Sequence, residues 1–158
     1  MRETDKFYFF WKHEFGQWTR RDMVDKLTIQ YNCCEQYMMY HKAILFKDYD
    51  TAQLILKESD PKKQKDLGRQ VKNYDENVWK MHRMSIVTSG NFLKFTQHGE
   101  LLEKLLDTGN KILVEASPYD SIWGCGLAAN DDRILDIDNW TGQNLLGQCL
   151  MNVRKLCQ

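Results

Sequence analysis

The helical spacing of apolar residues, interrupted by only two prolines, most constrains how this 158-residue chain can fold. Proline ends or kinks a helix, so a chain with so few prolines can hold helices of ordinary length. The hydrophobic fraction of 42% and the charged fraction of 28% match an ordinary globular protein and argue against disorder. No linker-like or low-complexity stretch divides the chain. We therefore predict a single domain over residues 1–158.

The predicted elements are mainly helices, with a few short strands between them. Apolar residues three and four positions apart indicate helices, whereas alternation or a short apolar run indicates a strand. Asp75 is the predicted N-cap of one helix, and Gly90 is expected to interrupt or end it. The predicted helices cover 34–46, 51–57, 60–68, 75–90, 97–108 and 145–156, and the predicted strands cover 7–11, 27–31 and 111–116. The predicted fold class is α+β, compact and mainly helical.

The charge balance and the spacing of cysteines and histidines exclude several classes of protein. Lys+Arg and Asp+Glu both number 22, so the chain lacks the basic surplus expected of a general nucleic-acid-binding protein. The five cysteines form no Cys-x-x-Cys pair and the four histidines are scattered, which argues against a disulfide framework or a zinc site. The N-terminal apolar run is too short for a signal peptide, and no stretch approaches the ~18 apolar residues of a membrane span. We expect a cytoplasmic protein without a metal or another cofactor.

Two polar clusters interrupt the apolar pattern in the first half of the chain. Glu35 and Lys42 are seven residues apart, about two helical turns, so both should project from one face of the same helix. Arg69, in the segment KDLGR, and Arg83 can each bind phosphate oxygens with a planar fork of N–H groups, and Trp79 precedes Arg83 by one turn. The competing interpretation is structural: a solvated pair at a helix edge, an exposed helix end and a core tryptophan.

Two further clusters lie in the second half of the chain. Glu115 directly follows an apolar strand, where ligand-binding groups are often found. Asp120, Trp123, Gly124 and Gly126 belong to the segment DSIWGCG, in which glycines permit close approach of the backbone to a ligand and the aspartate supplies an acid or a base. A solvated strand end and a structural turn with a packed tryptophan are the alternatives.

These clusters, in this order, resemble the NADAR/YbiA family. The matching segments are FYFFW, FGQW, CEQYMMYHKAILFKD, DPKKQKDLGRQVKNYDENVW, GNFLKF, LLDTGNKILVEASPYDSIWGCGL and WTGQNLLGQCLMNVR. They cover nearly the whole chain in order, which makes a chance match improbable. One departure is Gly16, where related sequences usually have serine, so a hydrogen bond from that hydroxyl to a substrate is in doubt here. The segment 19–26 is also individual and is a candidate for tuning specificity.

The resemblance implies an enzyme that cleaves a bond between an anomeric carbon and an exocyclic amine. One activity associated with the family hydrolyses ribosylaminopyrimidine phosphates, which are early intermediates of riboflavin synthesis. The other removes ADP-ribose from modified guanine bases, so ADP-ribosylated nucleic acid is a possible partner, with no membrane and no obligate protein partner. The alternative is a non-catalytic module that binds ADP-ribose or NAD. Such a module could lose Glu35 or Asp120, and the presence of both favours an enzyme.

The chemistry of this cleavage suggests a role for each residue. Positive charge builds on the sugar and negative charge on the departing amine, so the site needs a carboxylate and a proton donor. We assign Glu35 as the principal acid/base and Asp120 as the stabiliser of the sugar cation or the activator of water. Lys42 either polarises the substrate or attacks the anomeric carbon as an amine, and the sequence leaves both roles open. The predicted substrate-binding set is Arg69 and Arg83 for phosphates, Trp79 or Trp123 for a base, the amides of Gly124 and Gly126, and Glu115 and Asn144 for ribose hydroxyls.

Overall fold

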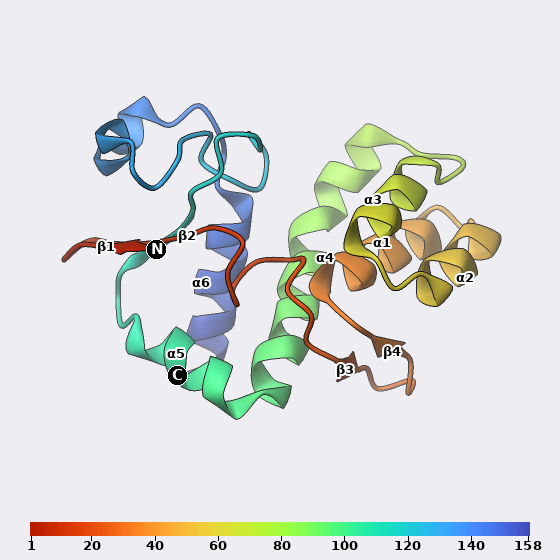
Figure 1. The fold of residues 1–158 in the computed structure, drawn as a ribbon. Helices are drawn as coiled ribbons and strands as arrows, with labels where there is room; N and C mark the ends of the chain where they lie inside the picture. Colours follow the sequence, from red (N-terminus) through yellow and green to blue (C-terminus); the bar gives the residue numbers. More distant parts are fainter. The chain divides into compact units, whose positions relative to one another are not determined.

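The computed structural model describes residues 1–158 and confirms the α+β fold class, with helices predominating (Figure 1). The chain forms two compact units. The helical unit is Gln17–Gln97, and the strand unit combines Met1–Gly16 with His98–Gln158. None of the helices is both long enough and apolar enough to cross a membrane. The single domain over residues 1–158 stays a prediction.

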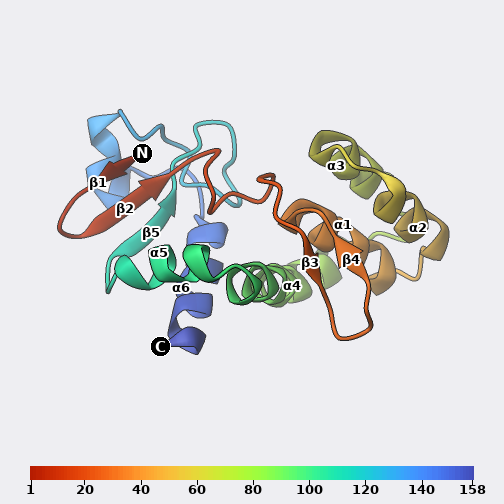
Figure 2. The same cartoon turned by 60° about the horizontal axis from the view of Figure 1, so that its bottom comes forward.

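The strand unit is built on a three-stranded sheet with the order β1-β2-β5. β1 (Arg2–Glu3) runs antiparallel to β2 (Phe7–Phe10), and β2 runs parallel to β5 (Ile112–Glu115) (Figure 2). All four residues of β2 are buried, as expected for a strand covered on both faces. The remaining elements of this unit are α5 (Gly99–Asp107), η1 (Asp132–Leu135), η2 (Ile137–Asn139) and α6 (Leu145–Cys157).

A glycine allows α6 to pack closely against β5. A Cβ atom at Gly147 would lie 2.1 Å from the carbonyl oxygen of Leu113, far inside van der Waals contact. We expect Gly147→Ala to lower the free energy of unfolding by about 3 kcal/mol, at the upper end for overpacking, because the obstructing atom is backbone. Thermal or chemical denaturation measures this change.

The matched control is Gly99→Ala, at the first residue of α5. A Cβ atom there has nothing within 4 Å, so this alanine should leave stability unchanged or raise it by up to about 1 kcal/mol. Equal stabilities for the two variants would contradict the close packing at Gly147.

The helical unit is arranged around α1 (Cys34–Leu45), which packs against three other helices. These helices are α2 (Tyr49–Lys57), α3 (Pro61–Arg69) and α4 (Glu76–Gln97). Asp48 caps α2 by accepting from the N–H of Thr51, and Asp60 caps α3 directly before its N-terminal proline. A short hairpin of β3 (Met23–Val24) and β4 (Gln30–Tyr31) completes the unit.

The structure corrects two of the element predictions and adds two short strands. α4 continues through Gly90 to Gln97, because the glycine makes room for the ring of Tyr37, whose Cδ1 would lie 2.6 Å from an added Cβ. In the predicted strand 27–31 only the last two residues are strand, because Thr28 adopts a positive φ of 64° in the hairpin turn. β1 and β3 were not predicted, since two residues are too few to show an alternating pattern.

Candidate functional site

Glu35 lies in the first turn of α1 and is almost completely buried, with 3% of its surface exposed. Its backbone N–H donates to the carbonyl oxygen of Gln17 at 2.9 Å, which fixes the segment before the helix against the start of α1. A carboxylate is favoured at this position because the N-terminal end of a helix carries partial positive charge. Burial of an ionisable side chain is costly, so a carboxylate retained here is a candidate for chemistry.

Lys42 lies two turns further along α1 and is half-buried. Its Nζ atom is 4.7 Å from the ring centre of Tyr74 and 5.6 Å from that of Trp79, within the range of cation–π contacts. Burial lowers the pKa of the Lys42 amine, the positive charge of Arg69 lowers it further, and the negative charge of Glu35 acts in the opposite direction. Lys42 therefore loses its proton more readily than an ordinary lysine.

The two predicted phosphate-binding arginines differ in their exposure. Arg83 is buried on α4, one turn after the buried Trp79, and its charge acts on the hydroxyl of Tyr74. Arg69 is at the C-terminal end of α3, with 69% of its side chain exposed and Nη1 at 4.0 Å from Asp66 Oδ1. A contact that long on an exposed pair is weak, so the guanidinium of Arg69 is available to an anion.

Five of the predicted residues thus gather within the helical unit around Lys42 and Tyr74. They are Glu35, Lys42, Arg69, Trp79 and Arg83. The gathering follows from the packing of α3 and α4 on α1, which brings together residues up to 48 positions apart in sequence (35 to 83). An acid, an amine of lowered pKa, two guanidinium groups and an indole are together suited to a phosphorylated substrate with an aromatic base.

Sequence reasoning missed two residues of this region. Tyr74 is in the connection between α3 and α4, and its ring contacts both Lys42 and Phe46. Its position directly before the N-cap Asp75 was the only signal in the sequence. Gln17 is buried, accepts from Asn91 Nδ2 at 2.8 Å through Oε1, and leaves its Nε2 without a hydrogen-bond partner. Because Gln17 also holds the start of α1, its free N–H group is a candidate donor to a substrate.

In the strand unit, the segment DSIWGCG forms a tight loop closed by Asp120. Asp120 Oδ1 accepts from the N–H groups of Ile122 and Trp123 at 2.9 and 2.8 Å, while Trp123 is half-buried. Both predicted glycines are required by packing: a Cβ at Gly124 would lie 2.8 Å from the Asp120 carbonyl oxygen, and Gly126 has a φ of +84°. The structure therefore accounts for both glycines without a ligand, and their amides as ligand donors stay a prediction.

Asn144 has a structural role at the end of β5. Its Oδ1 accepts from the N–H of Glu115 and its Nδ2 donates to the carbonyl oxygen of Leu113, both at 2.9 Å. The side-chain amide thus holds the strand that carries Glu115, and Glu115 itself is half-buried. The binding of ribose hydroxyls by Asn144 and Glu115, and the catalytic role of Asp120, stay predictions.

Comparison with known proteins decides the family. The family model described as the NADAR domain matches residues 2–157, which is nearly the entire chain. The chain belongs to the NADAR domain family. This NADAR chain is 43% identical to the "N-glycosidase R617" of Acanthamoeba polyphaga mimivirus over 97% of each protein. It is also 27% identical to the "Riboflavin biosynthesis protein VVA0006" of Vibrio vulnificus over 84% of this chain and 33% of that protein.

A solved structure confirms the NADAR/YbiA fold. The NMR structure of the Escherichia coli protein YbiA superposes with a TM-score of 0.77, covering 98% of this chain and 87% of that chain, at 22% identity. The full-length similarity to a named N-glycosidase identifies this NADAR protein as an enzyme, a hydrolase that acts on N-glycosyl compounds.

Proposed function

We propose that this NADAR enzyme cleaves the bond between the anomeric carbon of a ribosyl phosphate or ADP-ribosyl group and an exocyclic amine of a base. The observation that carries the proposal is the presence, on one face of α1, of the buried carboxyl group of Glu35 and the half-buried amine of Lys42, whose pKa is lowered. An amine whose pKa is lowered, within the electrostatic influence of a buried carboxyl group, is typical of acid–base sites.

The proposed reaction assigns a proton transfer to each of its stages. As the C–N bond breaks, Glu35 donates a proton to the departing amine, and the positive charge on the sugar is neutralised by the carboxylate it leaves. A new bond then forms at the anomeric carbon, either from water, which gives a proton back to Glu35, or from the neutral amine of Lys42, which gives one of its protons to Glu35. In the second case Glu35 returns that proton to the lysine nitrogen as water displaces it from the sugar, and Glu35 takes the proton that the water loses, so that the free lysine is restored. Overall one water is consumed and its two hydrogens are divided between the amine and the sugar.

The helical unit also offers contacts for the rest of such a substrate. Arg69 and Arg83 would bind phosphate oxygens. The rings of Trp79 and Tyr74 would pack against the base beside Lys42. Two substrates fit this chemistry: ADP-ribose attached to guanine, and a ribosylaminopyrimidine phosphate. The similarity to a riboflavin biosynthesis protein supports the second, and the presence of two arginines, one for each phosphate of a diphosphate, supports the first.

The experiment that tests the proposal offers both substrates to the same enzyme. DNA with ADP-ribosylated guanine and a ribosylaminopyrimidine phosphate are incubated separately, and release of the base is followed by chromatography. We expect release from at least one of them and no release by a Glu35→Gln variant. Tight binding of ADP-ribose with no release from either substrate would contradict hydrolysis and would favour the alternative of a non-catalytic ADP-ribose-binding module.

We expect Arg69→Ala to weaken the binding of ADP-ribose about tenfold, or about 1.4 kcal/mol. Removal of Arg69 leaves a phosphate without its charged partner, which weakens binding. The loss of binding free energy is moderate because the guanidinium is exposed to solvent. Calorimetric titration of both proteins measures this difference, and the melting temperature should not change. Lys62→Ala is the control, an exposed cation at the other end of α3. Unchanged affinity in Arg69→Ala would move the phosphate site away from α3, and a large drop in melting temperature would make Arg69 structural.

A further inference from the structure

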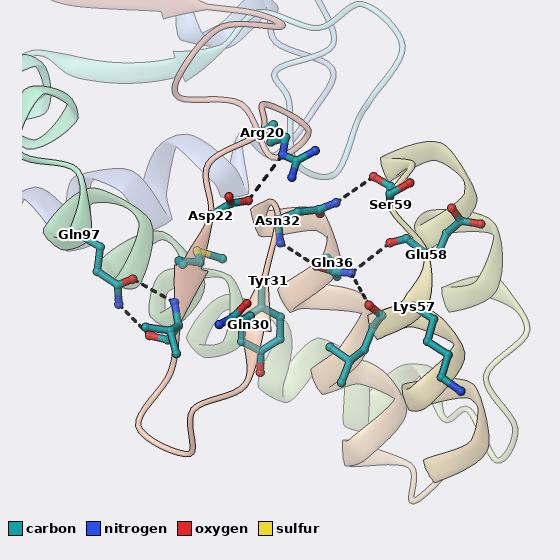
Figure 3. A pocket seen from close by; sticks show the side chains of 13 residues that line it. Arg20, Asp22, Gln30, Tyr31, Asn32, Gln36, Lys57, Glu58, Ser59 and Gln97 are labelled. Carbon is teal, nitrogen blue, oxygen red and sulfur yellow. Dashed lines mark hydrogen bonds and ion pairs between the residues drawn. The ribbon is translucent and has the colours of Figure 1, made fainter.

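A hollow in the helical unit lies beside the β3–β4 hairpin and has a volume of about 510 Å³ (Figure 3). This volume is within the usual range for a site that binds a small molecule. The lining comes from the hairpin and its flanks on one side and from residues 56–59, at the end of α2, on the other. None of the residues assigned above to catalysis or substrate binding lines this hollow, but four residues of the segment 19–26 do.

The helical unit covers the β3 edge of the hairpin with a side chain and leaves the β4 edge open. Gln97 binds the β3 edge through its side-chain amide: Oε1 accepts from the N–H of Val24 at 3.0 Å, and Nε2 donates to the carbonyl oxygen of the same residue at 2.7 Å (Figure 3). One amide group thus satisfies the outward-facing donor and acceptor of one strand residue. The β4 edge has no such cap.

The register of the hairpin shows which residue of β4 has backbone N–H and C=O groups that point away from β3. Val24 is opposite Gln30, and the backbone bond from Asp25 N–H to the Ile29 oxygen identifies the neighbouring pair as the hydrogen-bonded one. Because hydrogen-bonded and non-hydrogen-bonded pairs alternate in an antiparallel ladder, the N–H and C=O groups of Gln30 point away from β3. Gln30 lines the hollow, on the side of the hairpin that faces Lys57–Ser59 rather than Gln97 (Figure 3).

Two amide side chains of the lining, those of Gln36 and Asn32, already have hydrogen-bond partners. Gln36 donates through Nε2 to the carbonyl oxygens of Ile55 at 3.0 Å and Glu58 at 3.1 Å. Asn32 donates to the carbonyl oxygen of Ser59 at 2.9 Å. The floor of the hollow is therefore a fixed network of amides, and an unfilled donor and acceptor stand next to each other at its edge.

The charges of the lining favour a neutral ligand. Two cations, Arg20 and Lys57, are balanced by two carboxylates, Asp22 and Glu58, and Arg20 Nε already lies 3.5 Å from Asp22 Oδ1. A phosphate group would find no surplus of positive charge here. The ligand must instead match a donor and an acceptor side by side, as the amide of Gln97 does on the opposite edge.

We propose that this hollow binds a neutral heterocycle with a cyclic amide edge, whose C=O accepts from the N–H of Gln30 and whose ring N–H donates to the Gln30 carbonyl oxygen. A ring amide is held in the cis arrangement, so its donor and acceptor point the same way, as they do in the side chain of Gln97. Free pyrimidine and purine bases with such an edge belong to this class. The site is separate from Glu35 and Lys42 and does not depend on the proposed function.

The test uses uracil as the probe and the full-length, ¹⁵N-labelled protein. We expect a saturable shift of the Gln30 amide signal on titration with uracil, together with shifts of residues 56–59. The matched ligand is 1,3-dimethyluracil, which keeps the ring and both carbonyl groups but has no N–H. It should bind at least tenfold more weakly, because the Gln30 carbonyl oxygen is then left without a donor.

A protein variant tests the same contact from the other side. The backbone N–H that Gln30→Pro removes points away from β3, and proline is tolerated at such positions of edge strands. We expect this substitution to abolish uracil binding while the amide signal of Asp25, whose N–H donates across the hairpin to the Ile29 oxygen, is unchanged. Glu35→Gln should bind uracil as the wild type does. Equal binding of dimethyluracil, retained binding by a folded Gln30→Pro, or shifts confined to the surroundings of Lys42 would each overturn the proposal. So would an extended peptide that displaces uracil and binds more tightly, because the edge would then be a strand-docking site.

Discussion

Glu35→Gln is expected to fold normally and to lose at least about 100-fold in the rate of base release, the usual scale for removal of a general acid or base. Glutamine keeps the size of the side chain, so the packing at the start of α1 is preserved. It cannot donate a proton of carboxylic-acid strength to the leaving amine, and it carries no negative charge to face the sugar cation. Single-turnover kinetics with a melting curve measure both properties.

The control for Glu35→Gln is Asp50→Asn. Asp50 is also an acidic residue in the first turn of a helix, α2, but it is exposed. Both substitutions remove a favourable interaction with the N-terminal end of a helix, worth about 0.3–1 kcal/mol. The two variants should therefore lose a similar amount of stability from this cause. Only Glu35→Gln should affect turnover. Near-normal turnover by a folded Glu35→Gln protein would end the catalytic assignment of Glu35.

Lys42→Met should likewise lower the rate of base release at least about 100-fold, because both proposed roles of Lys42 need its amine. Lys42→Arg then separates the two roles. Arginine keeps the charge but stays protonated and is no nucleophile, so substantial activity in Lys42→Arg indicates polarisation of the substrate, and its loss indicates attack by the amine. Lys80→Met, an exposed lysine on α4, is the control.

The pH dependence of the wild-type enzyme provides a second measurement of Lys42. An amine that attacks must be neutral, so kcat/KM would rise with pH through the pKa of Lys42. Because burial lowers this pKa, the midpoint of the rise should lie below about 10.4, the pKa of an ordinary lysine. Trapping with borohydride would then add the mass of the sugar to Lys42. Full activity in Lys42→Met would exclude both roles.

The sequence predicted local features of the fold well because they depend on neighbouring residues. The Asp60–Pro61 start of α3 and the positions of α1, α5 and α6 follow from caps and apolar spacing. The continuation of α4 through Gly90 could not be predicted, since it depends on the ring of Tyr37, 53 positions away (37 to 90). The hairpin was also only half predicted, because the partner strand β3 has two residues and its edge is completed by Gln97.

In the candidate site, too, the sequence predicted what depends on neighbouring residues and missed what depends on packing between distant segments. The spacing of Glu35 and Lys42 was sufficient to place them on one face of α1. The proximity of Tyr74 to Lys42 and the unpartnered Nε2 of Gln17 arise from packing between segments, and no local pattern signals them. The glycines of the DSIWGCG segment suggested a ligand from sequence, whereas in the structure tight packing of the loop accounts for them.

The central claim is that the enzyme breaks the C–N bond at the anomeric carbon, and hydrolysis in H₂¹⁸O tests it most directly. Mass spectrometry of the released base and sugar from a ribosylaminopyrimidine phosphate gives the position of the label. Cleavage of the N-glycosidic bond predicts a base that keeps its amine and carries no ¹⁸O, together with a free sugar phosphate. Label in the base, or release of ammonia while the base and sugar remain joined, would show attack on the base and would contradict the assignment of this protein as an N-glycosidase.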